Sequence, residues 1–165
     1  MADLTFTVHL VAVVHSSRTE PTDDDWDNET TTIELVDPYG PDAVLGLEAF
    51  SHLEVAYLFH RVDPGQQVTH ARHPRGNPDW PLTGIFAQRG KDRPNRIGIS
   101  TCELLAVDGK TLTVRGLDAI DGSPVLDLKP YMSEFAPRTP VRQPAWSREL
   151  MAGYFTGGIE EPRGL

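Results

Sequence analysis

Cysteine is almost absent from this chain of 165 residues, which contains only Cys102. A single cysteine cannot form an internal disulfide, and we therefore expect a protein of the reducing cytoplasm. Because Cys102 lies in an alternating apolar stretch, it is predicted to be a buried structural thiol and not a nucleophile. No apolar run is long enough to cross a bilayer. The N-terminus also lacks the basic flank of a signal peptide, so we expect none.

Positive charge is scarce in the first part of the chain. Residues 1–60 contain 1 basic and 12 acidic residues, a net charge of −11, whereas residues 61–100 contain 7 basic and 3 acidic residues, a net charge of +4. The whole chain carries −9 and would repel a polyanion at long range. This balance excludes a general nucleic-acid coat but leaves room for a local pocket for an anionic ligand in the middle of the chain.

The sequence also lacks the common nucleotide-binding motifs and a recognisable metal-binding motif. There is no G-x-G-x-x-G turn, and Gly84, Gly90 and Gly98 do not follow P-loop spacing, so a doubly wound nucleotide fold is not expected. His70-x-x-His73 and the other histidines lack convincing ligand spacing, and the cysteine is solitary. We therefore predict no metal site.

What the sequence does contain is a series of short apolar strands separated by loops rich in glycine and proline. Strands are predicted over residues 4–14, 30–36, 52–62, 82–88, 97–107 and 111–115, short helices over 41–50 and 144–155, and loops over 19–29 and 63–81. The loop over 19–29 is expected to be solvated because it is strongly acidic. Strands at short intervals with little helix predict a mainly all-β barrel or sandwich with short peripheral helices.

The segment from Gly84 to Ser100, GIFAQRGKDRPNRIGIS, concentrates arginine and glycine. Guanidinium forks and open backbone amides together suit a carboxylate or phosphate, so Arg89 and Arg93 are candidates to bind one. Asn95 offers the donor and acceptor pair that can read an adenine edge. The alternative interpretation is a solvated hairpin tip, and spacing alone slightly favours it.

Two further sets of polar residues stand out. His60-Arg61 ends an apolar strand, and in an unbroken strand His52 and His60 would face the same side. Asp118 and Asp121 bracket a tight turn that ends at Gly122, where carboxylates can hydrogen-bond a ribose or balance a sulfonium charge. The plainer interpretations are a strand end meeting solvent and aspartates that form a turn.

The chain resembles the TsaA-like (TrmO) methyltransferases in several blocks. These are VVHSS (13–17), GLEAFSHLEVAYLFHR (46–61), RHPRGNPDWP (72–81), the basic segment (84–100) and GLDAIDGSPVLDLKPY (116–131). The resemblance implies a single β-barrel without a Rossmann fold, a homodimer, and S-adenosylmethionine as cofactor. The implied reaction methylates N6 of threonylcarbamoyladenosine beside the tRNA anticodon. We expect residues 1–140 to form the barrel and residues 141–165 a C-terminal helix and tail, within the same domain or at a dimer contact.

The resemblance also assigns candidate site residues. The expected cofactor-binding residues are His60, Arg61, Arg89, Ile99, Asp118, Ile120, Asp121 and Gly122. The expected substrate-binding residues are Arg75, Arg93, Asn95, Lys129 and Tyr131. The carbamoylated N6 is a poor nucleophile, so a carboxylate base would help the transfer, and Asp121 and Asp127 are the candidates.

The sequence departs from the family pattern in its acidic loop. DDDWDNE (23–29) stands where the family usually has a Pro-Arg-Gln segment. Together with the acidity of residues 1–60, this keeps two alternatives open. One is the same methyl transfer to a small nucleoside or secondary metabolite, and the other is a non-catalytic module that binds S-adenosylmethionine.

Overall fold

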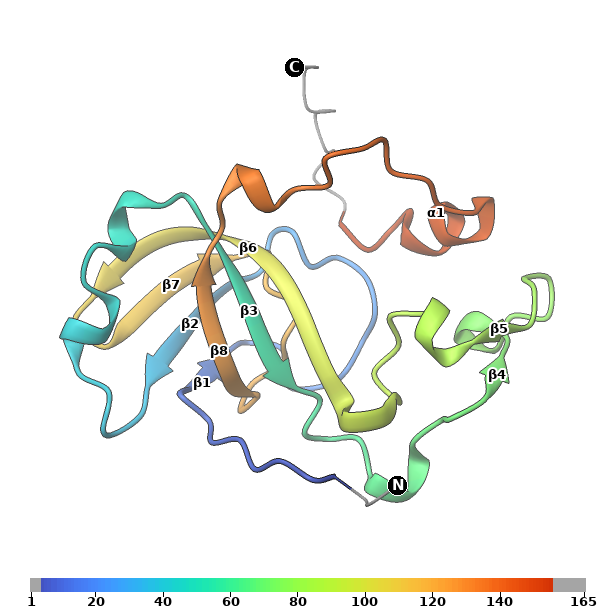
Figure 1. Ribbon diagram of the computed structural model, residues 1–165, viewed down its shortest axis with the longest axis horizontal. Helices are drawn as coiled ribbons and strands as arrows, with labels where there is room; N and C mark the ends of the chain where they lie inside the picture. The colour runs from blue at the N-terminus through green and yellow to red at the C-terminus, as the bar shows by residue number, and fades with distance from the viewer. Residues whose placement is uncertain (1–3, 156–165) are drawn as a thin grey trace.

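Six antiparallel strands close into a barrel in the computed structural model, which describes residues 4–155 (Figure 1). Around the barrel the strands follow the order β1-β2-β7-β6-β3-β8. Their bounds are β1 (Ala12–His15), β2 (Thr30–Leu35), β3 (His52–Leu58), β6 (Ile97–Asp108), β7 (Thr111–Arg115) and β8 (Pro124–Pro130). The predicted all-β barrel with short peripheral helices is therefore confirmed.

Alternation along these strands places one apolar set inside the barrel. The side chains of Val14, Ile33, Leu53, Val55, Leu112, Val114 and Val125 are all completely buried. Cys102 on β6 belongs to the same core, which confirms the predicted structural thiol. Burial is the main reason that the pKa of this thiol rises to about 12, so it stays protonated at neutral pH.

A second, two-stranded sheet lies beside the barrel, at the right of Figure 1, and is formed by β4 (Ala71–Arg72) and β5 (Thr83–Gly84). The predicted strand over 82–88 was wrong beyond Gly84, because residues 85–87 form a 3-10 turn. The basic segment therefore does not join two strands of one hairpin. It leads from the small sheet to β6 of the barrel.

Helices are short in the described residues. The 3-10 turns are η1 (Pro41–Val44), η2 (Leu47–Ala49), η3 (Pro64–Gln66), η4 (Pro74–Gly76), η5 (Ile85–Ala87), η6 (Pro94–Arg96) and η7 (Ser133–Phe135), and the α-helix is α1 (Ala145–Met151). The helix predicted over 41–50 is thus two 3-10 turns interrupted at Gly46, whose φ of 87° is left-handed. No helix among residues 4–155 is long and apolar enough to cross a membrane.

Two strand ends differ from the prediction. The alternating residues 4–10 do not pair, and the strand begins only at Ala12. β3 ends at Leu58, so His52 and His60 do not belong to one unbroken strand.

After β8 the chain runs along the outside of the molecule, and we call residues 131–155 the C-terminal strap. It passes along the upper edge in Figure 1 from the barrel to α1, beside the small sheet. Its end then returns to the barrel, because the Asp25 and Trp26 amides donate to the carbonyls of Gly153 and Tyr154, both at 3.0 Å. Residues 156–165 of the predicted C-terminal segment lie outside the described residues.

Candidate functional site

Asp118, on the turn after β7, lies between two tyrosine hydroxyls. The hydroxyl of Tyr57, which points inward from β3, is 2.9 Å from Oδ1 of Asp118 and 2.9 Å from its backbone oxygen. Tyr154 of the strap donates to Oδ2. Burial, followed by the charge of Asp118, raises the pKa of both phenols, so they remain hydrogen-bond donors at neutral pH.

Gly98 leaves the space that the Tyr57 ring occupies. The two residues are directly opposite in the register of β3 and β6. A Cβ atom on Gly98 would stand 2.5 to 2.9 Å from three ring atoms of Tyr57. This glycine of the basic segment therefore makes room for an aromatic ring in the barrel, which is a structural role that spacing did not reveal.

Arg89 brings the basic segment to the same place. Its Nη2 donates to the carbonyl of Ile99 at 2.7 Å, while the residue remains exposed. The charge of Arg89 also lies near enough to Tyr57 and Tyr154 to oppose part of the rise in their pKa. The structure thus gathers Arg89, Ile99 and Asp118, three of the predicted residues, around one end of β6.

His60 forms a second group with Arg61, Asp121 and Gly122. The imidazole Nε2 is 3.6 Å from the position that a Cβ atom on Gly122 would take, and the φ of 76° at Gly122 favours glycine there. Nδ1 of His60 is buried and has no hydrogen-bond partner. Desolvation, with a smaller contribution from the charge of Arg61, lowers the pKa of His60, so the ring is neutral at pH 7.

Asp121 is fixed by the backbone of the neighbouring loop. Its Oδ1 accepts from the Ser16 amide at 3.1 Å, and its own amide donates to the carbonyl of Arg18 at 2.8 Å. Ile120 beside it is 9% exposed, whereas Ile99 is 56% exposed. Asp121 is thus held beside His60, and its charge acts on the imidazole.

Most residues of the acidic loop are exposed, as expected for a solvated loop, but the ring of Trp26 within it is buried. Trp26 is 2% exposed, and the guanidinium of Arg18 lies 3.7 Å from the centre of its ring. Two arginines predicted for ligands meet carboxylates of this loop. Arg61 contacts Glu20 at 3.1 Å, and Arg75 contacts Asp24 at 3.0 Å. The loop therefore neutralises positive charge that the sequence placed beside the site.

Two other arginines of the basic segment, Arg93 and Arg96, support their own loop. Nη1 of Arg93 donates to the Gln88 carbonyl at 2.9 Å, and Nη1 of Arg96 donates to the Val62 carbonyl at 2.7 Å. Asn95 is exposed and has a left-handed φ of 61°. The buried Gln88 amide in turn donates to two carbonyls, so this loop is a rigid platform next to Arg89.

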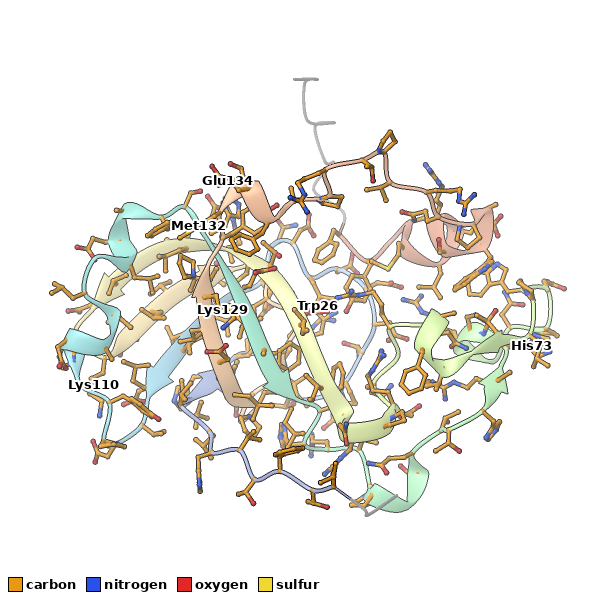
Figure 2. The ribbon with its side chains drawn as sticks, viewed as in Figure 1. Trp26, His73, Lys110, Lys129, Met132 and Glu134 are labelled. Carbon is orange, nitrogen blue, oxygen red and sulfur yellow. The ribbon has the colours of Figure 1, made fainter. Side chains whose placement is uncertain are left out.

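The remaining predicted residues lie on or just after β8. The carboxylate of Asp127 accepts hydrogen bonds from the Lys129 ammonium and from the Leu128 amide. Its bond to Lys129 and its charge raise the pKa of Lys129. Figure 2 places Lys129 on β8, and this side chain is largely exposed. Tyr131 follows the strand, with its amide donating to the carbonyl of His52 at 2.9 Å. The described contacts of Asp127 are thus with its own strand and not with the group around His60.

Sequence reasoning missed Tyr57 and Tyr154 as members of the site. For Tyr57 there was a signal, since a tyrosine at an inward position of a strand needs a partner for its hydroxyl. For Tyr154 there was none, because it lies 36 residues from Asp118. Tyr154 itself is partly buried. Between residues 4 and 155, no three His, Cys, Asp or Glu side chains gather as a metal site.

Comparisons with known proteins agree with this architecture. The chain is 39% identical over 140 residues to the tRNA (adenine(37)-N6)-methyltransferase of Escherichia coli K12, covering 78% of this chain and 58% of that protein. It is 38% identical over 138 residues to a probable S-adenosyl-L-methionine-binding protein of Methanothermobacter thermautotrophicus, covering 81% and 96% of the two chains. The crystal structure of TrmO from Pseudomonas aeruginosa matches with a TM-score of 0.68 and 29% identity, over 84% of this chain and 61% of that one.

The chain thus spans somewhat over half the length of the E. coli and P. aeruginosa proteins. A family model described as the tRNA-methyltransferase O N-terminal domain matches residues 11–137, which include the whole barrel and the described site residues other than Tyr154. The chain belongs to the tRNA-methyltransferase O N-terminal domain family.

Proposed function

We propose that this protein is an S-adenosylmethionine-dependent N-methyltransferase that modifies N6 of threonylcarbamoyladenosine next to the tRNA anticodon. The observation that carries the proposal is the convergence of Arg89 and Asp118 at one end of β6, in a chain whose relatives include a tRNA (adenine(37)-N6)-methyltransferase. The match covers 58% of the length of that relative.

The residues present suit the proposed cofactor. The buried Nδ1 of His60 lacks a partner, which marks a position for a ligand group. Arg89 uses Nη2 on the Ile99 carbonyl and keeps donors for a carboxylate. We assign His60, Arg61, Arg89, Ile99, Asp118, Ile120, Asp121 and Gly122 to cofactor binding. S-adenosylmethionine would supply a methyl group that is already activated.

The protein's own task is then to align the acceptor and to manage its proton. The lone pair of a carbamoylated N6 is delocalised, so a carboxylate that accepts its proton raises its nucleophilicity. Asp121, held by the Ser16 amide, is our first candidate for this base, and Asp127 remains the second. We assign Arg75, Arg93, Asn95, Lys129 and Tyr131 to the phosphates, the threonyl carboxylate and the base of the acceptor.

The decisive experiment supplies methyl-labelled S-adenosylmethionine to the purified protein with threonylcarbamoylated tRNA, followed by mass spectrometry of the nucleosides. We expect label in N6-methyl threonylcarbamoyladenosine. A protein that binds the cofactor and leaves this tRNA unchanged would exclude the proposed substrate. Label on a free nucleoside would then favour the small-molecule enzyme, which the acidic residues 1–60 support, and no transfer at all would favour the binding module.

Replacing Arg89 with lysine is expected to weaken cofactor binding about tenfold, a loss of about 1.4 kcal/mol, because an ammonium cannot make a planar fork to a carboxylate. Isothermal titration calorimetry with S-adenosylmethionine measures the change. Arg115→Lys is the matched control, since Arg115 pairs with Glu103 where β6 and β7 meet. If the two variants bind S-adenosylmethionine with equal affinity, Arg89 does not bind the cofactor and only supports its loop.

We further propose that the protein is a cytoplasmic homodimer. Supporting this, the unpaired residues Leu4, Phe6 and Val8 are 74%, 82% and 67% exposed, and apolar rows of this kind mark interfaces. Light scattering should give twice the mass of one chain. Substituting serine for all three is expected to give monomers, and a wild-type protein already monomeric at working concentration would contradict the proposal.

A further inference from the structure

Most positive charges of the described residues are already engaged within the molecule. Six of these side chains form ion pairs with carboxylates: Arg61, Arg72, Arg75, Lys110, Arg115 and Lys129. Four others donate to backbone carbonyls: Arg18, Arg89, Arg93 and Arg96. In the part of the chain that the structure describes, Lys91, Arg138, Arg142 and Arg148 are left without a hydrogen-bonded or ion-paired partner.

The three arginines among these four residues all belong to the C-terminal strap. The whole strap, residues 131–155, carries Arg138, Arg142 and Arg148 against Glu134 and Glu149, a net charge of +1 within a chain of −9. All three arginines are exposed. The strap therefore offers positive charge without internal partners, whereas Arg75 and Arg93, assigned above to the acceptor, must first release theirs.

Exposed apolar side chains are interleaved with these arginines. Phe135 is 78% exposed and Val141 is 67% exposed, and Met132 before them is 41% exposed. Figure 2 shows Met132 and Glu134 at the start of the strap, above the barrel. An exposed ring beside arginines is the combination on which unpaired bases stack while their phosphates are neutralised.

The strap is held at both ends, and its C-terminal end contacts the candidate site. At its start the Tyr131 amide donates to the His52 carbonyl at 2.9 Å. At its end Glu149 accepts from the indole of Trp80 at 2.9 Å, and Tyr154 donates to Asp118. Prolines at 137, 140 and 144 restrict the backbone between these anchors. A surface ordered before binding loses little entropy when it binds.

We infer that the C-terminal strap is the principal RNA-binding surface of this protein, with Arg138 and Arg142 on phosphates of an unpaired loop and Phe135 stacked on one of its bases. This inference rests on the proposed tRNA substrate and names the surface that recognises it. Charge favours RNA over a symmetric contact with a second copy, because such a contact would set the arginines of one strap against those of the other, whereas RNA brings the opposite charge.

The test compares two double variants that each remove two positive charges. In Arg138→Gln/Arg142→Gln we expect the KM for threonylcarbamoylated tRNA to rise at least tenfold at unchanged cofactor affinity. The slope of log affinity against log salt should become shallower by about 1.4, since each phosphate contact on a single strand contributes about 0.7. In the control, Lys110→Gln/Arg115→Gln, both quantities should stay at their wild-type values, because those cations pair with Asp37 and Glu103.

Phe135→Ala distinguishes stacking on an RNA base from the alternative, in which a second copy of the chain covers this surface. We expect the affinity for an anticodon stem-loop to fall about tenfold with the salt slope unchanged, because a stacked ring contributes no charge. If the variant instead halves the mass in light scattering and binds RNA as before, the surface is a contact between copies and the inference is wrong. It is also wrong if wild type methylates tRNA and the arginine variant matches its control. A wild type that does not act on tRNA would overturn the proposed function itself.

Discussion

Gly98→Ala is expected to destabilise the protein by about 1–3 kcal/mol, although it adds a single methyl group. The new Cβ atom would stand within 2.9 Å of three ring atoms of Tyr57. This ring is 2% exposed, and its hydroxyl is held by Asp118, so it cannot swing away without losing hydrogen bonds in the core. Urea denaturation followed by fluorescence should show a lower midpoint at unchanged m-value.

Gly84→Ala provides the matched control on the same basic segment. Gly84 has a φ of −59°, which alanine adopts freely, and its Cβ atom would meet nothing within 4 Å. We expect this variant to keep wild-type stability or to gain a few tenths of a kcal/mol from the stiffer unfolded chain. Combining Gly98→Ala with Tyr57→Leu should cost less than the sum of the single changes. Simple additivity would show that the ring is not what the methyl group meets.

The barrel could be predicted from the sequence because its strands alternate and because inward positions such as Val14 and Val55 are apolar. The same pattern misled at residues 4–10, where alternation is equally good but Leu4 and Phe6 remain exposed. An alternating pattern indicates which side chains a strand would bury. It does not indicate whether another strand has a free edge with which the segment can pair. In a closed barrel each edge is already paired, and that property belongs to the whole topology.

The site was predictable where its residues are close in the sequence. His60 and Arg61 are adjacent, and Asp121 and Gly122 belong to one turn, so short motifs identify them. The charge of the acidic loop predicted its exposure, but not that Arg18 covers the buried ring of Trp26 or that Arg75 neutralises Asp24. Such compensation between distant segments leaves no trace in local composition.

Asp118→Ala is expected to lower the free energy of unfolding by about 1.5–3 kcal/mol, because the hydroxyl of Tyr154 loses its charged acceptor and Tyr57 keeps only the backbone oxygen. Cofactor affinity should fall at least tenfold, since Asp118 is among the residues assigned to cofactor binding. Glu48→Ala, at an exposed position with no described contact, is the control and should change neither quantity. Calorimetry and urea denaturation measure the two effects on the same samples.

Tyr154→Phe completes a double-mutant cycle that locates the cause. If the hydroxyl of Tyr154 acts through Asp118, removing it after Asp118→Ala should cost almost nothing, and the coupling energy should lie within the range of about 0.5–3 kcal/mol found for residues in contact. The Asp25 and Trp26 amides still bond the carbonyls of Gly153 and Tyr154 in this variant, so the strap keeps its backbone anchors. Strictly additive losses would mean that the contact between Tyr154 and Asp118 adds no stability. The same cycle can be measured for cofactor affinity. If Tyr154→Phe and Asp118→Ala are also coupled there, the strap contributes to cofactor binding through Asp118, since the only atom removed in Tyr154→Phe is the oxygen bonded to Asp118.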